Sequence, residues 1–183
     1  MKRQIRRVSA YLSLPLVITV CLVGSGLGWA QDKHKIHFVN LPKNTTFRKQ
    51  FRLEAGDVPG HYVRIYEIHR RYPHDPPKFN GVSVTEQWDR GYSDYTDTNG
   101  RAWWYITYFL ENGDKIYART DGTTQTSHSD SHTSISTFVG VITITGGTGE
   151  FKGIRGLLQS KIRFSPATGF NMGEHTGEYW FEE

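Results

Sequence analysis

One carboxyl group shares a predicted strand face with apolar side chains. The segment 82–92, VSVTEQWDRGY, alternates with period two. This alternation places Glu86 on the same face as Val84 and Trp88. A carboxyl group inside an apolar barrel has a raised pKa and can act as a general acid or base. The alternative is a structural carboxylate at the rim, paired with a base such as Arg119.

Two groups of residues are candidates for a site. We assign Glu86 and Arg119 as candidate catalytic residues. The candidate ligand-binding residues are Trp88, Trp103, Tyr105 and Glu178. A wall of aromatic side chains suits a flat apolar ligand, although aromatic residues in strands also fill cores. Glu178 is included because it could form, with Glu86 or Glu67, the carboxylate pair across a barrel that glycosidases require.

The segment 101–111, RAWWYITYFLE, is apolar on both faces of its predicted strand. Trp103 and Tyr105 share one face, and Trp104 and Ile106 share the other. Strands that are apolar on both faces are expected where both sides are covered. One set is therefore expected to line a barrel, and the other to be covered at an interface between subunits.

No metal or cofactor site is predicted. His128 and His132 flank Asp130 in a polar loop, but no helix places both imidazoles on one side, as an ordered zinc site requires. The sequence holds neither a G-x-S-x-G elbow nor an H-E-x-x-H motif.

Residues 1–30 have the features of a secretory signal peptide. A basic start, MKRQIRRVSA, precedes an apolar run of about a dozen residues and the small residues Gly28 and Ala30. The run is shorter than the roughly 20 residues that span a bilayer. We expect cleavage before Gln31 and a secreted or periplasmic protein without membrane attachment; an uncleaved anchor is the alternative.

Cleavage changes the charge balance. The chain has 22 Lys plus Arg and 18 Asp plus Glu, and four of the bases but none of the acids precede Gln31, leaving 18 of each. A neutral chain without clustered Lys and Arg predicts no nucleic-acid partner. Cys21 is the single cysteine, so the mature protein has neither a disulfide nor a thiol nucleophile.

Most of the mature chain alternates with period two. Residues 31–60 are expected to form an extended lead-in with one short strand near 47–53, and residues 61–183 to form the domain. The predicted strands are 61–72, 82–92, 101–111, 114–127, 135–145, 154–164 and 173–183. Turn signals recur between them, at Asn80-Gly81, Asn99-Gly100, Asn112-Gly113, Asp121-Gly122, Gly146-Gly147 and Thr168-Gly169. Seven or eight antiparallel strands predict an all-β barrel or sandwich.

The glycine-rich stretch 144–156, ITGGTGEFKGIRG, invites comparison with a phosphate-binding loop. Such a loop needs a following helix, whose N-terminus supplies aligned N–H groups. The residues from Ile154 to Phe164 instead alternate like a strand. We therefore interpret the stretch as a turn between strands, in which glycines supply positive φ.

The same stretch resembles the GGTG-x-F-x-G-x-x-G segment of the allene oxide cyclase and dirigent barrel superfamily, particularly its secreted bacterial members. Residues 88–124 are similar to those members in hairpin layout, and the resemblance covers about residues 60–183. It implies a closed, calycin-like antiparallel barrel of about eight strands, often trimeric in plants. Plant relatives guide cyclisation or coupling of small apolar substrates, and some bacterial relatives cyclise polyketides. The motif is structural and transfers no catalytic residue.

Two functions follow as hypotheses. The first is a barrel that binds an apolar small molecule and isomerises or cyclises it without a cofactor, mainly by confining a reactive conformer. The second is a non-enzymatic structural or interaction protein of the cell envelope. Either could form a homo-oligomer, as a trimer or a dimer.

Overall fold

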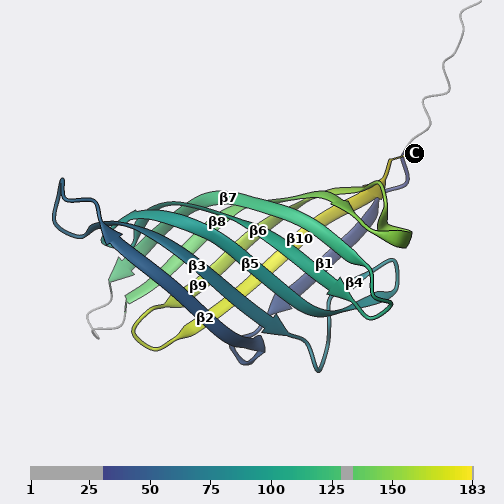
Figure 1. Ribbon diagram of the computed structural model, residues 1–183, viewed down its shortest axis with the longest axis horizontal. Helices are drawn as coiled ribbons and strands as arrows, with labels where there is room; N and C mark the ends of the chain where they lie inside the picture. Colours follow the sequence, from purple (N-terminus) through teal and green to yellow (C-terminus); the bar gives the residue numbers. More distant parts are fainter. Residues whose placement is uncertain (1–30, 129–133, 183) are drawn as a thin grey trace, which may run out of the picture. The chain divides into compact units, whose positions relative to one another are not determined.

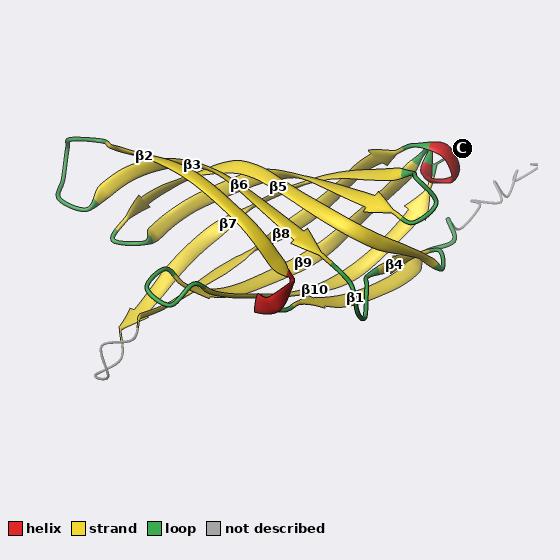
Figure 2. Ribbon diagram, turned by 60° about the horizontal axis from the view of Figure 1, so that its bottom comes forward, coloured by secondary structure: helices red, strands yellow, loops and turns green. Residues whose placement is uncertain are grey.

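The regular structure is almost entirely β-strand. The computed structural model describes residues 31–128 and 134–182. Its strands are β1 (His34–Asn40), β2 (Thr45–Glu54), β3 (His61–Arg71), β4 (Lys78–Phe79), β5 (Val82–Thr96), β6 (Asn99–Leu110), β7 (Lys115–His128), β8 (Ser134–Gly147), β9 (Ile154–Ser165) and β10 (Phe170–Phe181). Two 3-10 turns, η1 (Pro42–Asn44) and η2 (Gly149–Phe151), precede β2 and β9 (Figure 2). The predicted all-β class is confirmed.

Two predictions concern residues outside the described part. The signal peptide at residues 1–30 and the loop residues Asp130 and His132 lie there. Within the described residues, none of the helical segments has the length and apolar character needed to cross a membrane.

The strands form one antiparallel sheet in the order β1-β10-β9-β8-β7-β6-β5-β3-β2, with β4 beside β5. The sheet curls, so that one face is concave (Figure 1). Its edges, β1 and β2, are not paired with each other. The prediction of a closed barrel of about eight strands is therefore wrong, because this is an open half-barrel of ten strands. Closure needs a strand tilt and stagger that bring both edges into register, which a strand count does not supply.

Residues 31–60 contribute both edges of the sheet. β1 pairs with β10 and β2 pairs with β3, where the sequence predicted one short strand. The alternation of β2 is unusual, because Phe51 and Leu53 are exposed on the convex face at 66% and 74%. The residues that alternate with them, Gln50 and Arg52, are polar. A strand without an apolar buried face gives a weak sequence signal.

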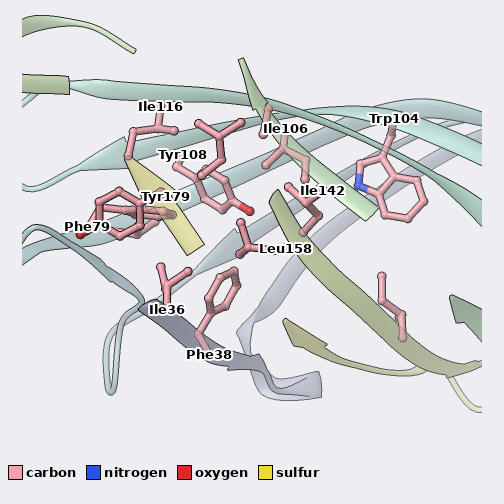
Figure 3. Packing of buried hydrophobic residues seen from close by; sticks show 14 of the residues in the cluster. Ile36, Phe38, Phe79, Trp104, Ile106, Tyr108, Ile116, Ile142, Leu158 and Tyr179 are labelled. Carbon is pink, nitrogen blue, oxygen red and sulfur yellow. The ribbon is translucent and has the colours of Figure 1, made fainter. Parts of the chain in front are cut away.

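β6 shows which side of the sheet holds the core. Trp104, Ile106 and Tyr108 are buried on the concave face, whereas Tyr105 on the convex face is 60% exposed. Isoleucines from β7 and β8 and aromatic residues from β1 and β10 pack on the same concave side (Figure 3). Of the two sets left open by the sequence, the set with Trp104 is inside.

The short strand β4 covers one end of this core. Asn80 and Gly81 have φ of 47° and 83°, as a tight hairpin turn requires, and they join β4 to β5. The hairpin buries Phe79 completely, with its ring centroid 5.6 Å from that of Tyr108 and 5.4 Å from that of Tyr179. The predicted Asn-Gly turn is confirmed here.

The glycine-rich stretch is a turn between strands, as predicted. It joins β8 to β9 through η2, and Gly149 and Gly153 have φ of 52° and 81°. A Cβ on Gly153 would lie 2.4 Å from the backbone oxygen of Glu182. Glycine at this position therefore allows both the left-handed backbone and the close approach of the last strand.

We expect Phe79→Ala to lower the free energy of unfolding by about 3–5 kcal/mol, because it removes a fully buried ring and leaves a cavity. The control is Val139→Ala on β8, where the side chain is 57% exposed. It should change the free energy by no more than about 0.5 kcal/mol. Urea denaturation measures both, and equal effects of the two substitutions would contradict the role assigned to Phe79.

Candidate functional site

A buried ion pair lies on the concave face between β3 and β5. Arg70 and Asp89 are 2% and 3% exposed, and the Arg70 Nη1 donates to Asp89 Oδ2. Gln87 Nε2 donates to the other carboxylate oxygen over 2.7 Å, and Arg70 Nη2 donates to Asn171 Oδ1 on β10 over 3.0 Å. Each ion thus has a neutral partner in addition to its counter-ion, as a buried pair needs.

A chain of polar side chains continues from this pair toward β1. Tyr72 Oη lies within hydrogen-bond distance of Gln87 Oε1 and is 2.7 Å from Asn40 Oδ1 on β1. Asn40 Nδ2 is 3.2 Å from His175 Nε2 on β10. These side chains connect β3 and β5 with β1 and β10. They therefore span the opening of the half-barrel, where no backbone ladder exists.

A cavity of about 240 Å³ lies on the concave face beside the ion pair. Its apolar walls come from β6, β8 and β9, with Trp104, Phe138, Ile162 and Phe164 among them. Arg70, Asp89 and Ser165 supply buried polar atoms. The turn between β9 and β10 borders it, and Arg48 Nη2 on β2 donates to Gly169 O of that turn over 2.8 Å.

An irregularity in β5 decides which of its residues reach this cavity. Val84 pairs with Leu110 and Glu86 with Phe109, so Thr85 is an extra residue opposite β6. Such a bulge moves the following side chains to the opposite face. Gln87 and Asp89 therefore point to the concave side. The predicted placement of Glu86 on the face of Val84 is wrong for this reason.

Glu86 lies in a cluster on the convex side. Its Oε2 is 3.0 Å from His69 Nε2, and its Oε1 is 3.5 Å from Arg71 Nε. Trp88 stacks on the His69 ring, with centroids 4.1 Å apart and an angle of 9° between the ring planes. This arrangement matches the structural alternative for a paired carboxylate, although the partner is not Arg119.

The remaining predicted site residues also lie outside the cavity. Arg119 is exposed on β7, paired across the ladder with Tyr105, and Glu178 binds Lys33 at the surface. Trp103 and Tyr105 border an open hollow of about 480 Å³ on the convex face. The structure thus brings Trp103 and Tyr105 together but separates both from the concave cavity, and their role in ligand binding stays a prediction.

The residues that form the polar side of the cavity were missed by sequence reasoning. Arg70 and Asp89 stand in strands where both faces mix polar and apolar residues. One signal was available in the sequence. After the bulge, every second residue of β5 faces the concave side, namely Gln87, Asp89, Gly91, Ser93 and Tyr95. Nothing in the sequence marks Thr85 as the extra residue.

Burial sets the protonation behaviour of this network. Burial raises the pKa of the Asp89 carboxyl, and the charge of Arg70 opposes that rise. Burial, with smaller contributions from the positive charges of Arg70 and His37, lowers the pKa of His175 to about 3. His175 is therefore neutral at physiological pH, and Asn40 Nδ2 can donate to its Nε2.

The cavity has the composition of a small-molecule site. Among the described residues, no group of three or more His, Cys, Asp or Glu side chains is arranged to hold a metal ion. The cavity combines apolar walls with a few buried polar groups, as small-molecule sites do.

Comparisons with known proteins add little to this description. No family model matches the chain, and no curated protein matches it. A solved structure of the pterocarpan synthase dirigent protein GePTS1 aligns over 96% of this chain and 100% of its own, with 16% identity and a TM-score of 0.44. A similarity at this level does not establish a shared fold. The resemblance to the barrel superfamily therefore stays a prediction.

The neutral state of His175 predicts a specific loss of stability in acid. The unfolded chain binds a proton near pH 6.5, whereas the folded chain does so only near pH 3. Stability is therefore complete above about pH 6.5 and falls as the pH drops below it, by about 2 kcal/mol at pH 5 from this group. Urea denaturation between about pH 7.5 and 5 should show this loss in the wild type, and a loss smaller by that amount in His175→Gln. Equal pH dependence in the two proteins would contradict a buried neutral His175.

Proposed function

We propose that the protein binds a small molecule in the concave cavity beside Arg70 and Asp89. The observation that carries this proposal is an apolar-walled cavity with charged side chains buried at its edge. Its volume of about 240 Å³ is just below the roughly 300–1,000 Å³ of drug-sized sites. A molecule of one or two rings therefore suits it. The packed core around Phe79 occupies the remaining concave face and limits longer ligands.

Within this proposal, chemistry on the ligand would be an isomerisation or cyclisation that needs no cofactor. Such a reaction needs confinement of one conformer and a group that moves a proton at the ligand. Asp89 is the buried carboxyl group at the cavity, and because Arg70 and Gln87 already bond its two oxygens, a ligand would have to replace one of these bonds to exchange a proton with it. Export of the protein, predicted from residues 1–30, stays a prediction, and the proposal holds in any compartment.

A second candidate function is supported by the convex face. Apolar side chains pair across β2 and β3, Leu53 with Val63 and Phe51 with Ile65. Ile65 and Phe51 are 63% and 66% exposed. Tyr105 extends this surface on β6. Contiguous exposed apolar surfaces mark interaction sites. We propose that a second copy of the chain covers this surface, which would form the homo-oligomer predicted from the sequence. The edge strand β2 would lie at this interface.

The first proposal is tested with the neutral two-ring probe 2-naphthamide and isothermal titration calorimetry. Ser165→Leu adds bulk to a buried cavity residue and should weaken binding at least tenfold. Gln159→Leu places a leucine on the convex face of the same strand, where Gln159 is exposed, and should leave the affinity unchanged. Thermal unfolding checks both folds, since overpacking costs about 1–3 kcal/mol.

Two results would contradict the cavity as the ligand site. Binding that survives Ser165→Leu but is lost in Tyr105→Ser would move the site to the convex hollow that holds Trp103. A protein that takes up no probe and sediments as an oligomer would favour the interaction protein instead.

A further inference from the structure

The concave cavity is bordered by more cationic than anionic residues. Three cationic residues of the concave face border it, namely Arg48, Arg64 and Arg70. The two acidic residues that border it already have ion-pair partners, because Asp89 binds Arg70 and Glu67 binds Arg90. Within the described part of the chain, Arg48 and Arg64 form no ion pair. The cavity therefore has an excess of positive charge.

Two of these cations are close enough to affect each other. Burial and the positive charge of Arg70 together lower the pKa of Arg48. Arg48 is held against the turn between β9 and β10 by its bond to Gly169 O, and Arg70 is held to the same hairpin by Asn171. Their mutual repulsion is relieved by an anion bound near both guanidinium groups.

Two buried donors at the cavity have no hydrogen-bond partner among the described residues. These are Arg70 Nε and Ser165 Oγ, in residues that are 2% and 1% exposed. An unsatisfied buried polar group costs about 1–3 kcal/mol. Both residues border the cavity. A ligand with acceptor oxygens at this place would satisfy both donors.

The opposite wall of the cavity is apolar and largely aromatic. Trp104 and Phe138 lie with ring centroids 4.7 Å apart, and Ile162 and Phe164 extend the wall along β9. This side suits the flat apolar body of a ligand. The two sides together suit a molecule with an apolar ring system and an anionic group at one end.

We propose that the cavity selects an aromatic carboxylate of one or two rings. The carboxylate accepts hydrogen bonds from Arg70 Nε and Ser165 Oγ and is attracted by Arg48, while the rings pack against Trp104 and Phe138. A planar carboxylate matches the geometry of guanidinium donors. This inference rests on the proposed function and names the class of molecule that the same cavity binds.

The test compares 2-naphthoate, which is ionised at neutral pH, with its neutral counterpart 2-naphthamide by calorimetry. We expect 2-naphthoate to bind at least tenfold more tightly. Arg48→Gln should weaken 2-naphthoate binding about tenfold and leave 2-naphthamide unchanged, because Arg48 is exposed and contributes charge. The matched control is Arg52→Gln on the same strand, where Arg52 pairs with Glu54 and does not border the cavity.

Ser165→Ala provides a second variant that removes one donor and little volume. It should weaken binding of 2-naphthoate more than that of 2-naphthamide. Equal affinity for the two probes, unchanged by Arg48→Gln, would overturn the inference and leave the proposed function standing. Binding of neither probe would overturn both.

Discussion

One buried ion pair, Arg70 with Asp89, fixes how the polar part of the concave face is arranged. Moving each ion out of water costs several kcal/mol, and their attraction offsets this cost only when the other polar atoms are also bonded. Gln87 and Asn171 supply those bonds from β5 and β10. The pair therefore requires β3, β5 and β10 to lie close together on the concave side. The ion pair thus holds these strands together near the opening of the half-barrel, where the edge strands β1 and β2 do not pair.

This requirement explains how the concave face divides. Around Phe79 and Tyr108 the side chains are apolar and fill the space. Around Arg70 they are polar and leave a cavity, because guanidinium and carboxylate groups need fixed partners. A half-barrel held partly by side-chain bonds across its opening has one region specialised for stability and another available for binding. The unsatisfied Arg70 Nε belongs to the second region.

The sequence predicted the alternating strands and two of the turns of this fold, but it did not predict the bulge at Thr85 or the position of every turn. Alternation identified β3 and the strands from β5 to β10, but it missed the short strand β4. The Asn80-Gly81 turn and the glycine-rich turn at 144–156 were predicted from the backbone conformations that glycine allows. The turn before β6 consists of Asp97 and Thr98, with φ of 49° and 64°, whereas the predicted turn residues Asn99 and Gly100 already belong to β6. Asp121-Gly122 lies inside β7, where Gly122 faces Gly140 and a Cβ would lie 2.6 Å from the Phe138 ring. Such glycines make room for a side chain, which local sequence does not distinguish from a turn.

The candidate site was harder to predict than the fold. One extra residue, Thr85, exchanges the faces of β5 and replaces Glu86 by Asp89 at the cavity. A shift of one residue moves every side chain to the other face, so a single bulge changes the whole set of site residues. The edge strand β2 carries Arg48 but lacks an apolar buried face. Its contribution to the cavity depends on contacts with β9 and β10 that are distant in sequence.

The most direct measurement replaces both ions at once, in the double variant Arg70→Met/Asp89→Leu, and determines its stability and its binding of 2-naphthoate. If the pair serves binding, the variant folds with stability equal to or above that of the wild type, because apolar replacements of a buried pair are often neutral or stabilising by about 1–4 kcal/mol. It also loses 2-naphthoate binding. A variant that unfolds, or one that still binds 2-naphthoate with wild-type affinity, would contradict the account.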